Sequence, residues 1–294
     1  MGHDHHHHHK NMDQKNILIA FALNFSFAII ELIGGFFTNS VSIMSDALHD
    51  FGDSLALLFA YFAQKVSTKD PDEIYTFGYR RFSILSAFIN AVILLGGSIF
   101  VIIEAIGRIA NPEVVKPEGM LALAILGIIV NSYAAFRLSK DEGLNSKMVK
   151  LHLLEDVLGW VSVLVVSIIL IFEPWYFLDS VLSILISVII LRGVWKNLKK
   201  ISFIFLQKFP ENLKVDELKH EILSIHNIQD IHAIRAVSLD DNHFYLRLHV
   251  CVPGELTMVE LDGLKVQIKK LLKQYQVITS TLEFESYKGD CLQD

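Results

Sequence analysis

Long runs of hydrophobic residues, separated by short polar stretches, fill the first two thirds of the 294-residue chain. An α-helix needs about 20 mostly apolar residues to cross a bilayer. Six runs approach that length, at residues 17–37, 41–64, 82–106, 120–136, 151–172 and 175–191. This pattern predicts an α-helical membrane protein whose main part, residues 17–209, is a bundle of six transmembrane helices.

The run at 41–64 is the most polar of the six, because it carries Asp46, His49, Asp50 and Asp53. We still predict a membrane span there, since Leu55–Phe62 is strongly apolar and both ends fit short loops. Ionisable groups in a span are costly, and they usually face a protein interior or a water-filled path. These four side chains are therefore candidates for function.

Basic residues indicate the orientation, because cytoplasmic loops are enriched in Lys and Arg. They gather in the N-terminal tail, in the second and fourth connections and after the sixth span: Lys10, Lys15, Lys65, Lys69, Arg80, Arg81, Arg137, Lys140, Lys147, Lys150, Arg192, Lys196, Lys199 and Lys200. The other connections hold only Arg108 and Lys116. We expect both termini in the cytoplasm, and a bacterial inner membrane as the location.

The last third is patterned like a soluble domain. Residues 192–209 predict a helix that leaves the membrane, and Pro210 marks the boundary. Beyond it the periodicity predicts helices and strands in the order helix 212–225, strand 228–239, strand 243–252, helix 257–275 and strand 277–285. We expect residues 210–294 to form a small cytoplasmic α+β domain with a mostly antiparallel sheet.

Residues 1–16 form a polar tail that contains HDHHHHH. An interrupted histidine run is not the usual six-histidine expression tag, so we interpret it as a native metal-capturing tail, with a tag as the alternative. The net charge of −6 gives no reason to expect a nucleic-acid partner.

Two pairs of side chains repeat one spacing. His49 and Asp53 are four residues apart in the second span, and His152 and Asp156 repeat that spacing in the fifth. Each pair shares one face of its helix. Two such faces would supply two nitrogens and two oxygens, a plausible tetrahedral shell for Zn²⁺. Either pair alone could be a polar cluster or an interhelical hydrogen bond, but the duplication favours a metal site.

The ligand types limit the ion without fixing it. Nitrogen and oxygen ligands without thiolate disfavour Cu(I), but Co²⁺, Cd²⁺ and Ni²⁺ remain open beside Zn²⁺. The depth of the site is open too. His49 and Asp53 lie near mid-span, whereas His152 is close to the cytoplasmic end of 151–172. Either the fifth span begins earlier, or the site lies nearer the cytoplasm.

Three motifs carry a family resemblance: SVSIMSDALHDFGDSLAL in the second span, TFGYRRFSILSAFINA leading into the third, and HLLEDVLGWVSVLV in the fifth. With them the chain resembles the cation diffusion facilitator family over almost all its length. The resemblance implies a homodimeric metal/proton antiporter that works by alternating access, with His49, Asp53, His152 and Asp156 as its transport site. The histidine at position 49 resembles zinc-type members. The cytoplasmic domain would resemble a metallochaperone.

The same resemblance implies a regulatory metal site in the cytoplasmic domain, at positions His232, His249, Glu283 and Glu285. The two glutamates alternate along a strand and share a face. The alternative is that all four are ordinary polar residues at strand ends. Some relatives have another site between the second and third spans, but that loop, STKDPDEIYTFGYRR, contains no histidine, so we do not predict it here.

Other functions remain as alternatives. A membrane-anchored metal sensor would not need paired ligands in the membrane, and a passive channel would conduct metal without regard to the pH gradient. We find no nucleotide-binding glycine loop, and a two-His, two-Asp shell leaves no open catalytic position, so we predict neither an enzyme nor a cofactor. The roles of Asp46, Asp50 and Glu155 are not settled by the sequence.

Overall fold

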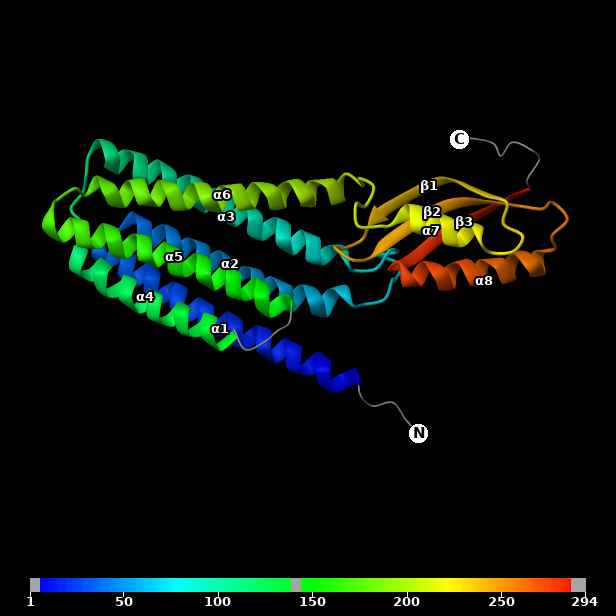
Figure 1. Ribbon diagram of the computed structural model, residues 1–294, viewed down its shortest axis with the longest axis horizontal. Helices are drawn as coiled ribbons and strands as arrows, with labels where there is room; N and C mark the ends of the chain where they lie inside the picture. Colours follow the sequence, from blue (N-terminus) through cyan, green and yellow to red (C-terminus); the bar gives the residue numbers. More distant parts are fainter. Residues whose placement is uncertain (1–5, 139–143, 287–294) are drawn as a thin grey trace. The chain divides into compact units, whose positions relative to one another are not determined.

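The computed structural model describes residues 6–138 and 144–286, and some helical side chains within these ranges are not described. The elements are α1 (His6–Thr38), α2 (Val41–Ser67), α3 (Arg81–Ala110), α4 (Pro117–Leu138), α5 (Leu144–Phe172), α6 (Phe177–Phe205), α7 (Val215–Leu223), β1 (Asp230–Ser238), β2 (Phe244–Val252), α8 (Met258–Gln274) and β3 (Val277–Ser286) (Figure 1).

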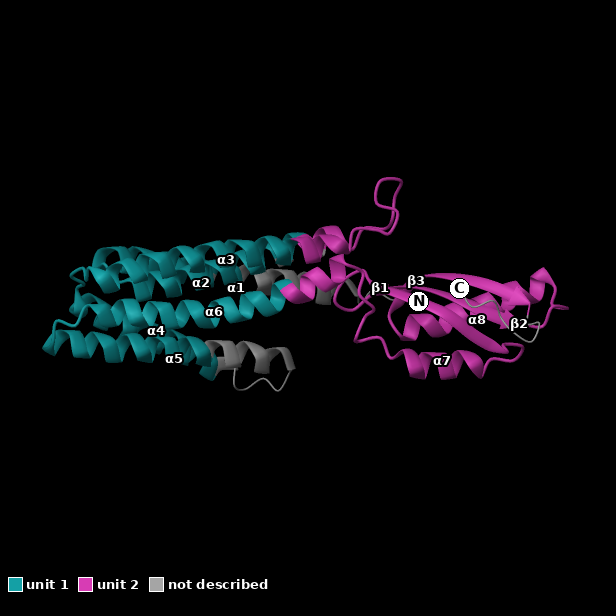
Figure 2. Ribbon diagram, turned by 90° about the horizontal axis from the view of Figure 1, so that it is seen from above, with its two compact units in different colours: residues 1–62, 86–198 teal, residues 63–85, 199–294 magenta. Residues whose placement is uncertain are grey.

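The chain divides into two compact units (Figure 2). The first is the helical bundle, Met1–Phe62 with Ser86–Leu198. The second contains the C-terminal domain from Lys199 onward together with Ala63–Leu85, the segment that ends α2, connects it to α3 and begins α3. The loop between the second and third predicted spans is thus part of the same unit as the C-terminal domain.

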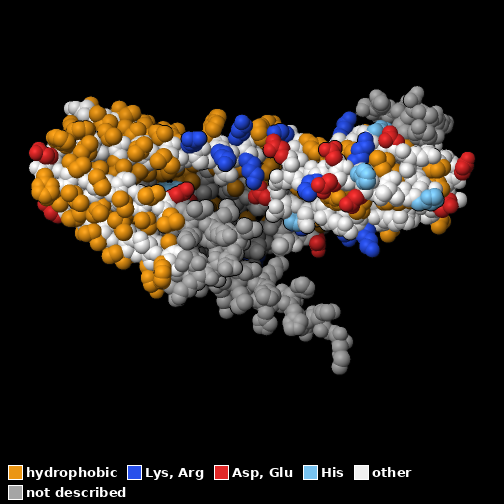
Figure 3. Space-filling model, viewed as in Figure 1, with side chains coloured by type: hydrophobic (Ala, Val, Ile, Leu, Met, Phe, Trp, Pro, Cys, Tyr) orange, Lys and Arg blue, Asp and Glu red, His pale blue; other side chains and the backbone are white. Residues whose placement is uncertain are grey.

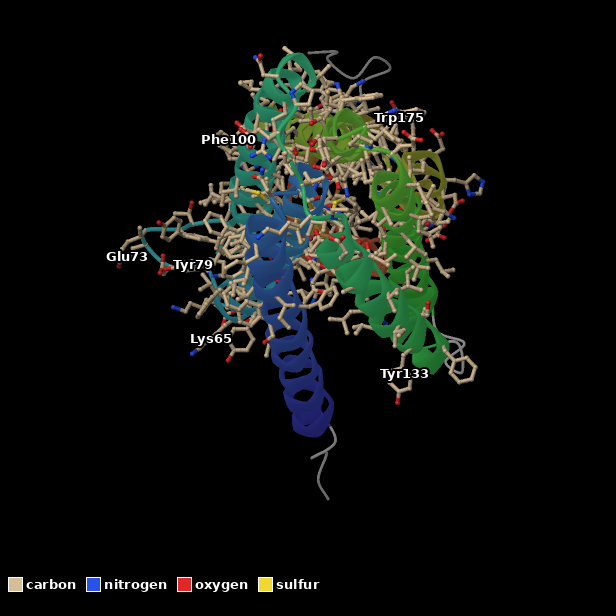
Figure 4. The ribbon with its side chains drawn as sticks, turned by 90° about the vertical axis from the view of Figure 1, so that its left-hand side faces the viewer. Lys65, Glu73, Tyr79, Phe100, Tyr133 and Trp175 are labelled. Carbon is tan, nitrogen blue, oxygen red and sulfur yellow. The ribbon has the colours of Figure 1, made fainter. Side chains whose placement is uncertain are left out.

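The helical bundle has a small core and an apolar exterior. Ile43, Met120, Trp160 and Val163 are among the buried residues that join α2, α4 and α5. Hydrophobic side chains also cover the outside of this unit (Figure 3). Figure 4 shows Phe100, Tyr133 and Trp175 pointing away from the bundle, and their exposed fractions are 64%, 64% and 52%. Such an exterior is stable against lipid and unstable in water.

The six helices of the bundle coincide with the six predicted spans. Within the described residues, three helical segments are long and apolar enough to span a membrane: Arg81–Ala110, Leu154–Phe172 and Phe177–Phe205. Shorter apolar segments lie at Asn24–Thr38 and Pro117–Tyr133. The remaining helix, α2, is the one that carries the aspartates and His49.

Three helices are longer than the predicted spans. Helix α1 begins at His6, so it includes much of the stretch predicted to be a polar tail. Helix α5 begins at Leu144, earlier than the predicted start at residue 151. His152 therefore lies inside the helix and not at its end. Helix α6 continues without a break to Phe205, so the predicted sixth span and the helix predicted to leave the membrane are one element.

The C-terminal domain has the predicted order of helices and strands, in a three-stranded sheet of order β1-β2-β3. Strands β1 and β2 are antiparallel, whereas β2 and β3 are parallel, so the expectation of a mostly antiparallel sheet was wrong for one of the two pairs. The cause is helix α8, a crossover that returns the chain to the starting end of β2 before β3 begins.

Helices α7 and α8 supply the hydrophobic core under this sheet. Leu218 and Ile222 of α7, together with Ile268 and Leu272 of α8, pack in one buried cluster with the strand residues. Helix α8 begins with a capping box, in which Thr257 and Glu260 satisfy each other's backbone amides. The opposite face of the sheet is left for polar side chains.

Candidate metal centres

The first candidate centre is on α2. His49 and Asp53 are one helical turn apart, and His49 Nε2 lies 3.8 Å from Asp53 Oδ2. Both side chains are 27% exposed, so an ion could reach them. The structure therefore brings together the two α2 residues predicted from their spacing.

The α5 half of this centre is described only in part. Asp156 is half-buried on α5. His152 belongs to the same helix one turn earlier, but its side chain lies outside the described part of the structure. Among described residues, the groups of three side chains with ligand atoms within 4.8 Å of one another are both in the C-terminal domain. His49, Asp53 and Asp156 thus form no such tight group.

Helices α2 and α5 nevertheless approach each other beside these residues. A Cβ atom added at Gly159 of α5 would lie 3.8 Å from Oδ1 of Asp46 on α2. The two helices run in opposite directions (Figure 1). Going along α2 from Asp46 therefore corresponds to going back along α5 from Gly159, which brings His49 and Asp53 alongside Asp156 and His152.

Glu31 of α1 lies close to this contact. Its side chain is almost completely buried, and the charged groups around it are Asp50, Asp46 and Asp156. Asp46 and Asp50 are themselves buried. Sequence reasoning did not assign Glu31 to the metal site. The signal that could have singled it out is a glutamate in an otherwise apolar run.

The second candidate centre is on the polar face of the C-terminal sheet. The strand register pairs His232 with His249, and His249 with Glu283. His249 Nδ1 lies 2.5 Å from Glu285 Oε1, and His232 Nε2 lies 3.3 Å from Glu285 Oε2. His232, His249 and Glu285 form one of the two described groups with metal-like spacing. Three of the four predicted residues are therefore brought together.

Glu283 is held differently from the other three. Its two carboxylate oxygens accept hydrogen bonds from Arg247 Nε and Nη2 at 2.8 and 3.2 Å. These hydrogen bonds and the positive charge of Arg247 lower the pKa of Glu283 below its usual value. Glu283 Oε2 is still 3.1 Å from His249 Nε2, so it lies at the edge of the cluster.

A neighbouring group was not predicted from the sequence. Asp230, His232 and Cys251 form the second described set of side chains with metal-like spacing, and it shares His232 with the first. Asp230 pairs with Cys251 across β1 and β2. Their juxtaposition depends on strand register, which spacing in the sequence does not reveal.

Comparison with known proteins agrees with this architecture. Residues 17–206 match the family model for the cation efflux transmembrane domain. The chain belongs to the cation efflux family. Residues 210–287 match the cytoplasmic domain of cation efflux proteins. The protein is therefore a multi-pass integral membrane transporter and not an enzyme, with a helical transmembrane domain followed by a small α+β domain, as the sequence predicted.

Relatives in the cation efflux family match along almost the whole chain. The cadmium, cobalt and zinc/H(+)-K(+) antiporter of Bacillus subtilis is 33% identical over 290 residues, covering 97% of this chain and 92% of the relative. The zinc transporter ZitB of Escherichia coli is 33% identical over 297 residues, covering 97% and 93%. The metal cation efflux system protein CzcD of Cupriavidus metallidurans is 32% identical over 286 residues, covering 97% and 90%.

Proposed function

We propose that this protein exports Zn²⁺ from the cytoplasm in exchange for protons, by alternating access at His49, Asp53, His152 and Asp156. Cd²⁺ and Co²⁺ fit the same nitrogen and oxygen ligands. Family membership and the names of the relatives support divalent-cation efflux coupled to protons. The observation that carries the site is the antiparallel approach of α2 and α5 at Asp46 and Gly159.

Exchange follows from competition for the same ligands. A metal ion binds only deprotonated ligands, so metal arriving from the cytoplasm displaces protons, and protons arriving from outside displace the metal. Histidine and carboxylate side chains can carry out both halves of this exchange. No separate chemical step is required, and the proton gradient supplies the driving force.

The partial exposure of the two α2 ligands is compatible with this cycle. His49 and Asp53 lie 3.8 Å apart, and each side chain is 27% exposed. A transport site has to release its ion, so the ligands must be able to separate. Small movements of α2 relative to α5 would separate the four proposed ligands and bring them together again.

The test is exchange of zinc for protons by the purified protein in liposomes that contain a pH reporter. Asp53→Asn and Asp156→Asn preserve side-chain size but remove the charge. We expect each variant to lower the initial rate of exchange at least about tenfold, because losing a charged ligand removes more than about 1.4 kcal/mol of metal-binding free energy. The matched control is Glu155→Gln, an exposed carboxylate beside Asp156, which should retain the rate.

Folding of each variant is checked by its elution as a single species from size-exclusion chromatography. Wild-type rates in folded Asp53→Asn and Asp156→Asn would refute the proposed site. Zinc flux that ignores the pH gradient would instead indicate a channel. Testing Cd²⁺ and Co²⁺ in the same liposomes establishes the range of ions.

We also propose that His232, His249 and Glu285 hold a regulatory zinc ion in the C-terminal domain, with Glu283 at its edge. The support is the spacing of their ligand atoms and the burial of His249, which keeps the imidazole in place. Nitrogen and carboxylate ligands suit zinc. The tethering of Glu283 by Arg247 argues that this residue contributes less than Glu285.

A further inference from the structure

A buried polar cluster joins the beginning of α6 to the beginning of α2. Asp179, in the first turn of α6, is 1% exposed. Its carboxylate accepts hydrogen bonds from Ser40 Oγ at 2.6 Å and from Ser42 Oγ at 2.5 Å. It also accepts from the backbone amides of Val41 at 2.7 Å and Ser42 at 3.3 Å. A single carboxylate thus receives four donors from one short segment.

These donors are the groups that the start of a helix leaves unsatisfied. The first amides of an α-helix have no carbonyl partner within the helix, and they form its positive end. Asp179 satisfies the first two amides of α2, and Ser40 Oγ accepts from the third, Ile43 N, at 3.2 Å. The cap of α2 is therefore supplied largely by another helix.

Two serines of α6 continue the contact along α2. Ser183 Oγ donates to the carbonyl oxygen of Val41 at 3.3 Å, and Ser187 Oγ lies 3.1 Å from Ser45 Oγ. Asp179, Ser183 and Ser187 are spaced four residues apart, so they share one side of α6. All three are buried. They form a line of polar contacts, which we call the α2–α6 zipper.

The zipper ends one turn before the proposed metal ligand. On α2 its contacts run from Val41 to Ser45, and the next residue at the four-residue spacing of Val41 and Ser45 is His49. Gly159 of α5 approaches Asp46, next to Ser45. The part of α2 that α6 fixes is thus followed directly by the turns that carry His49 and Asp53, on the way toward the cytoplasm.

We propose that the α2–α6 zipper sets the height and rotation of α2, and that Asp179 is a positioning residue for metal transport. A slip of α2 by one turn would leave a buried carboxylate without its donors in an apolar bundle, a costly state that disfavours other registers. The zipper thereby holds His49 and Asp53 at the level of α5. This inference rests on the proposed function, because it takes His49 as a ligand.

The test measures zinc/proton exchange as a function of zinc concentration in liposomes. Asp179→Asn removes the charge, and Ser45→Ala and Ser187→Ala remove the last contact of the zipper. We expect KM for zinc to rise about tenfold in Asp179→Asn and about threefold in each serine variant, in keeping with the loss of one buried hydrogen bond or more. The maximal rate should change less than KM, because the ligands themselves remain.

A matched control is Ser167→Ala. Ser167 is as buried as Ser187, but its described hydrogen bond goes to Leu164 O within its own helix, at 2.8 Å. We expect its KM to match the wild type. If Ser45 and Ser187 act through their mutual contact, the double variant Ser45→Ala/Ser187→Ala should be no worse than the single variants.

A folded Asp179→Asn protein with wild-type KM would overturn the inference. If Asp179→Asn does not fold, the serine variants decide, and wild-type KM in both would overturn it equally. Asp53→Asn separates the two proposals. If Asp53→Asn exchanges zinc normally, the proposed function fails. If Asp53→Asn loses zinc exchange but the zipper variants keep the wild-type KM, only the positioning role of the zipper is refuted.

Discussion

At the scale of single residues, three carboxylates show how this protein stabilises a negative charge. Asp179 is inside the bundle and receives four hydrogen bonds from the start of α2. Glu283 lies on the C-terminal sheet and accepts hydrogen bonds from Nε and Nη2 of Arg247. Asp240 is in the turn between β1 and β2. There its Oδ1 accepts from the amides of Asn242 and His243, each at 2.8 Å.

Asp240 makes the stability of the second unit depend on pH. Burial acts to raise its pKa, but hydrogen bonds from Asn242 and His243 outweigh burial and hold the pKa below its usual value. Arg80 Nη1 also lies 3.3 Å from Asp240 Oδ2. Because the folded pKa is lowered, the stabilisation is complete above the unfolded value, about 3.9, and is lost as pH falls through the lower folded value.

We therefore expect Asp240→Asn to lower the thermal midpoint of the purified protein at pH 6. The midpoint of the wild type should decrease between pH 5 and pH 3, a window placed about the usual carboxyl pKa, and this decrease should be smaller in Asp240→Asn. The control is Asp241→Asn, since Asp241 forms an exposed ion pair with Lys200 that contributes little. Identical pH profiles for the wild type and Asp240→Asn would contradict this account.

The cytoplasmic cluster gives a second residue-scale prediction. In an Asp53→Asn background, which removes the proposed membrane ligand, His249→Ala and Glu285→Gln should each lower the zinc retained per chain after dialysis, measured by mass spectrometry. The reason is that each removes one of three close ligands. His220→Ala, an exposed histidine on α7, is the control. Unchanged zinc content in His249→Ala would rule out the cluster as a metal site.

At the scale of elements, glycine lets α4 and α5 pack closely. A Cβ atom added at Gly127 of α4 would lie 2.3 Å from the ring of Trp160 of α5, a side chain that is 1% exposed. Real contacts of this kind are never so short, so either the helices or the indole ring must move. The close packing of these helices also supports the part of α5 that carries Asp156.

We expect Gly127→Ala to destabilise the protein by about 1–3 kcal/mol through overpacking, seen as a lower thermal midpoint in detergent. Gly107→Ala on α3 is the matched control, because an added Cβ there meets no atom within 4 Å. Alanine is also the better helix former, so Gly107→Ala should be neutral or stabilising. A neutral Gly127→Ala would mean that Trp160 is not confined as described.

At the scale of the whole molecule, the two units suit different solvents. The apolar exterior of the helical bundle suits lipid, and the polar surface of the C-terminal domain suits water. The bundle exposes many large hydrophobic side chains, Phe100 and Tyr133 among them, whereas the C-terminal domain has a buried hydrophobic core between its sheet and helices α7 and α8. Membership of the cation efflux family makes the first unit a transmembrane domain. The distribution of Lys and Arg leads us to expect both termini on the cytoplasmic side.

We expect the protein to be a homodimer assembled largely through its C-terminal domain, because the family model that matches this domain is named as a dimer domain. Light scattering of the full-length protein in detergent should give the mass of two chains. Deletion of residues 211–294 should weaken the dimer but preserve the membrane metal site. A full-length protein with the mass of one chain would exclude this assembly. Complete loss of metal binding on deletion would favour a sensor over a transporter.

Much of this organisation follows from local sequence. The apolar runs predict the six helices, because a bilayer requires long apolar segments wherever they stand in the fold. The repeated His-to-Asp spacing identifies candidate ligands, because residues four apart share a helix face in any tertiary context. The C-terminal elements also follow from periodicity within short windows.

The tertiary structure decided what depends on contacts between distant segments. The approach of Gly159 to Asp46, the neighbours of Glu31 and the four donors around Asp179 join residues from different helices. The parallel pairing of β2 and β3, and with it the meeting of His249 and Glu285, depends on strand register. The sequence determined which side chains could bind metal, whereas packing decided which of them meet, because contact between segments is a property of the folded chain.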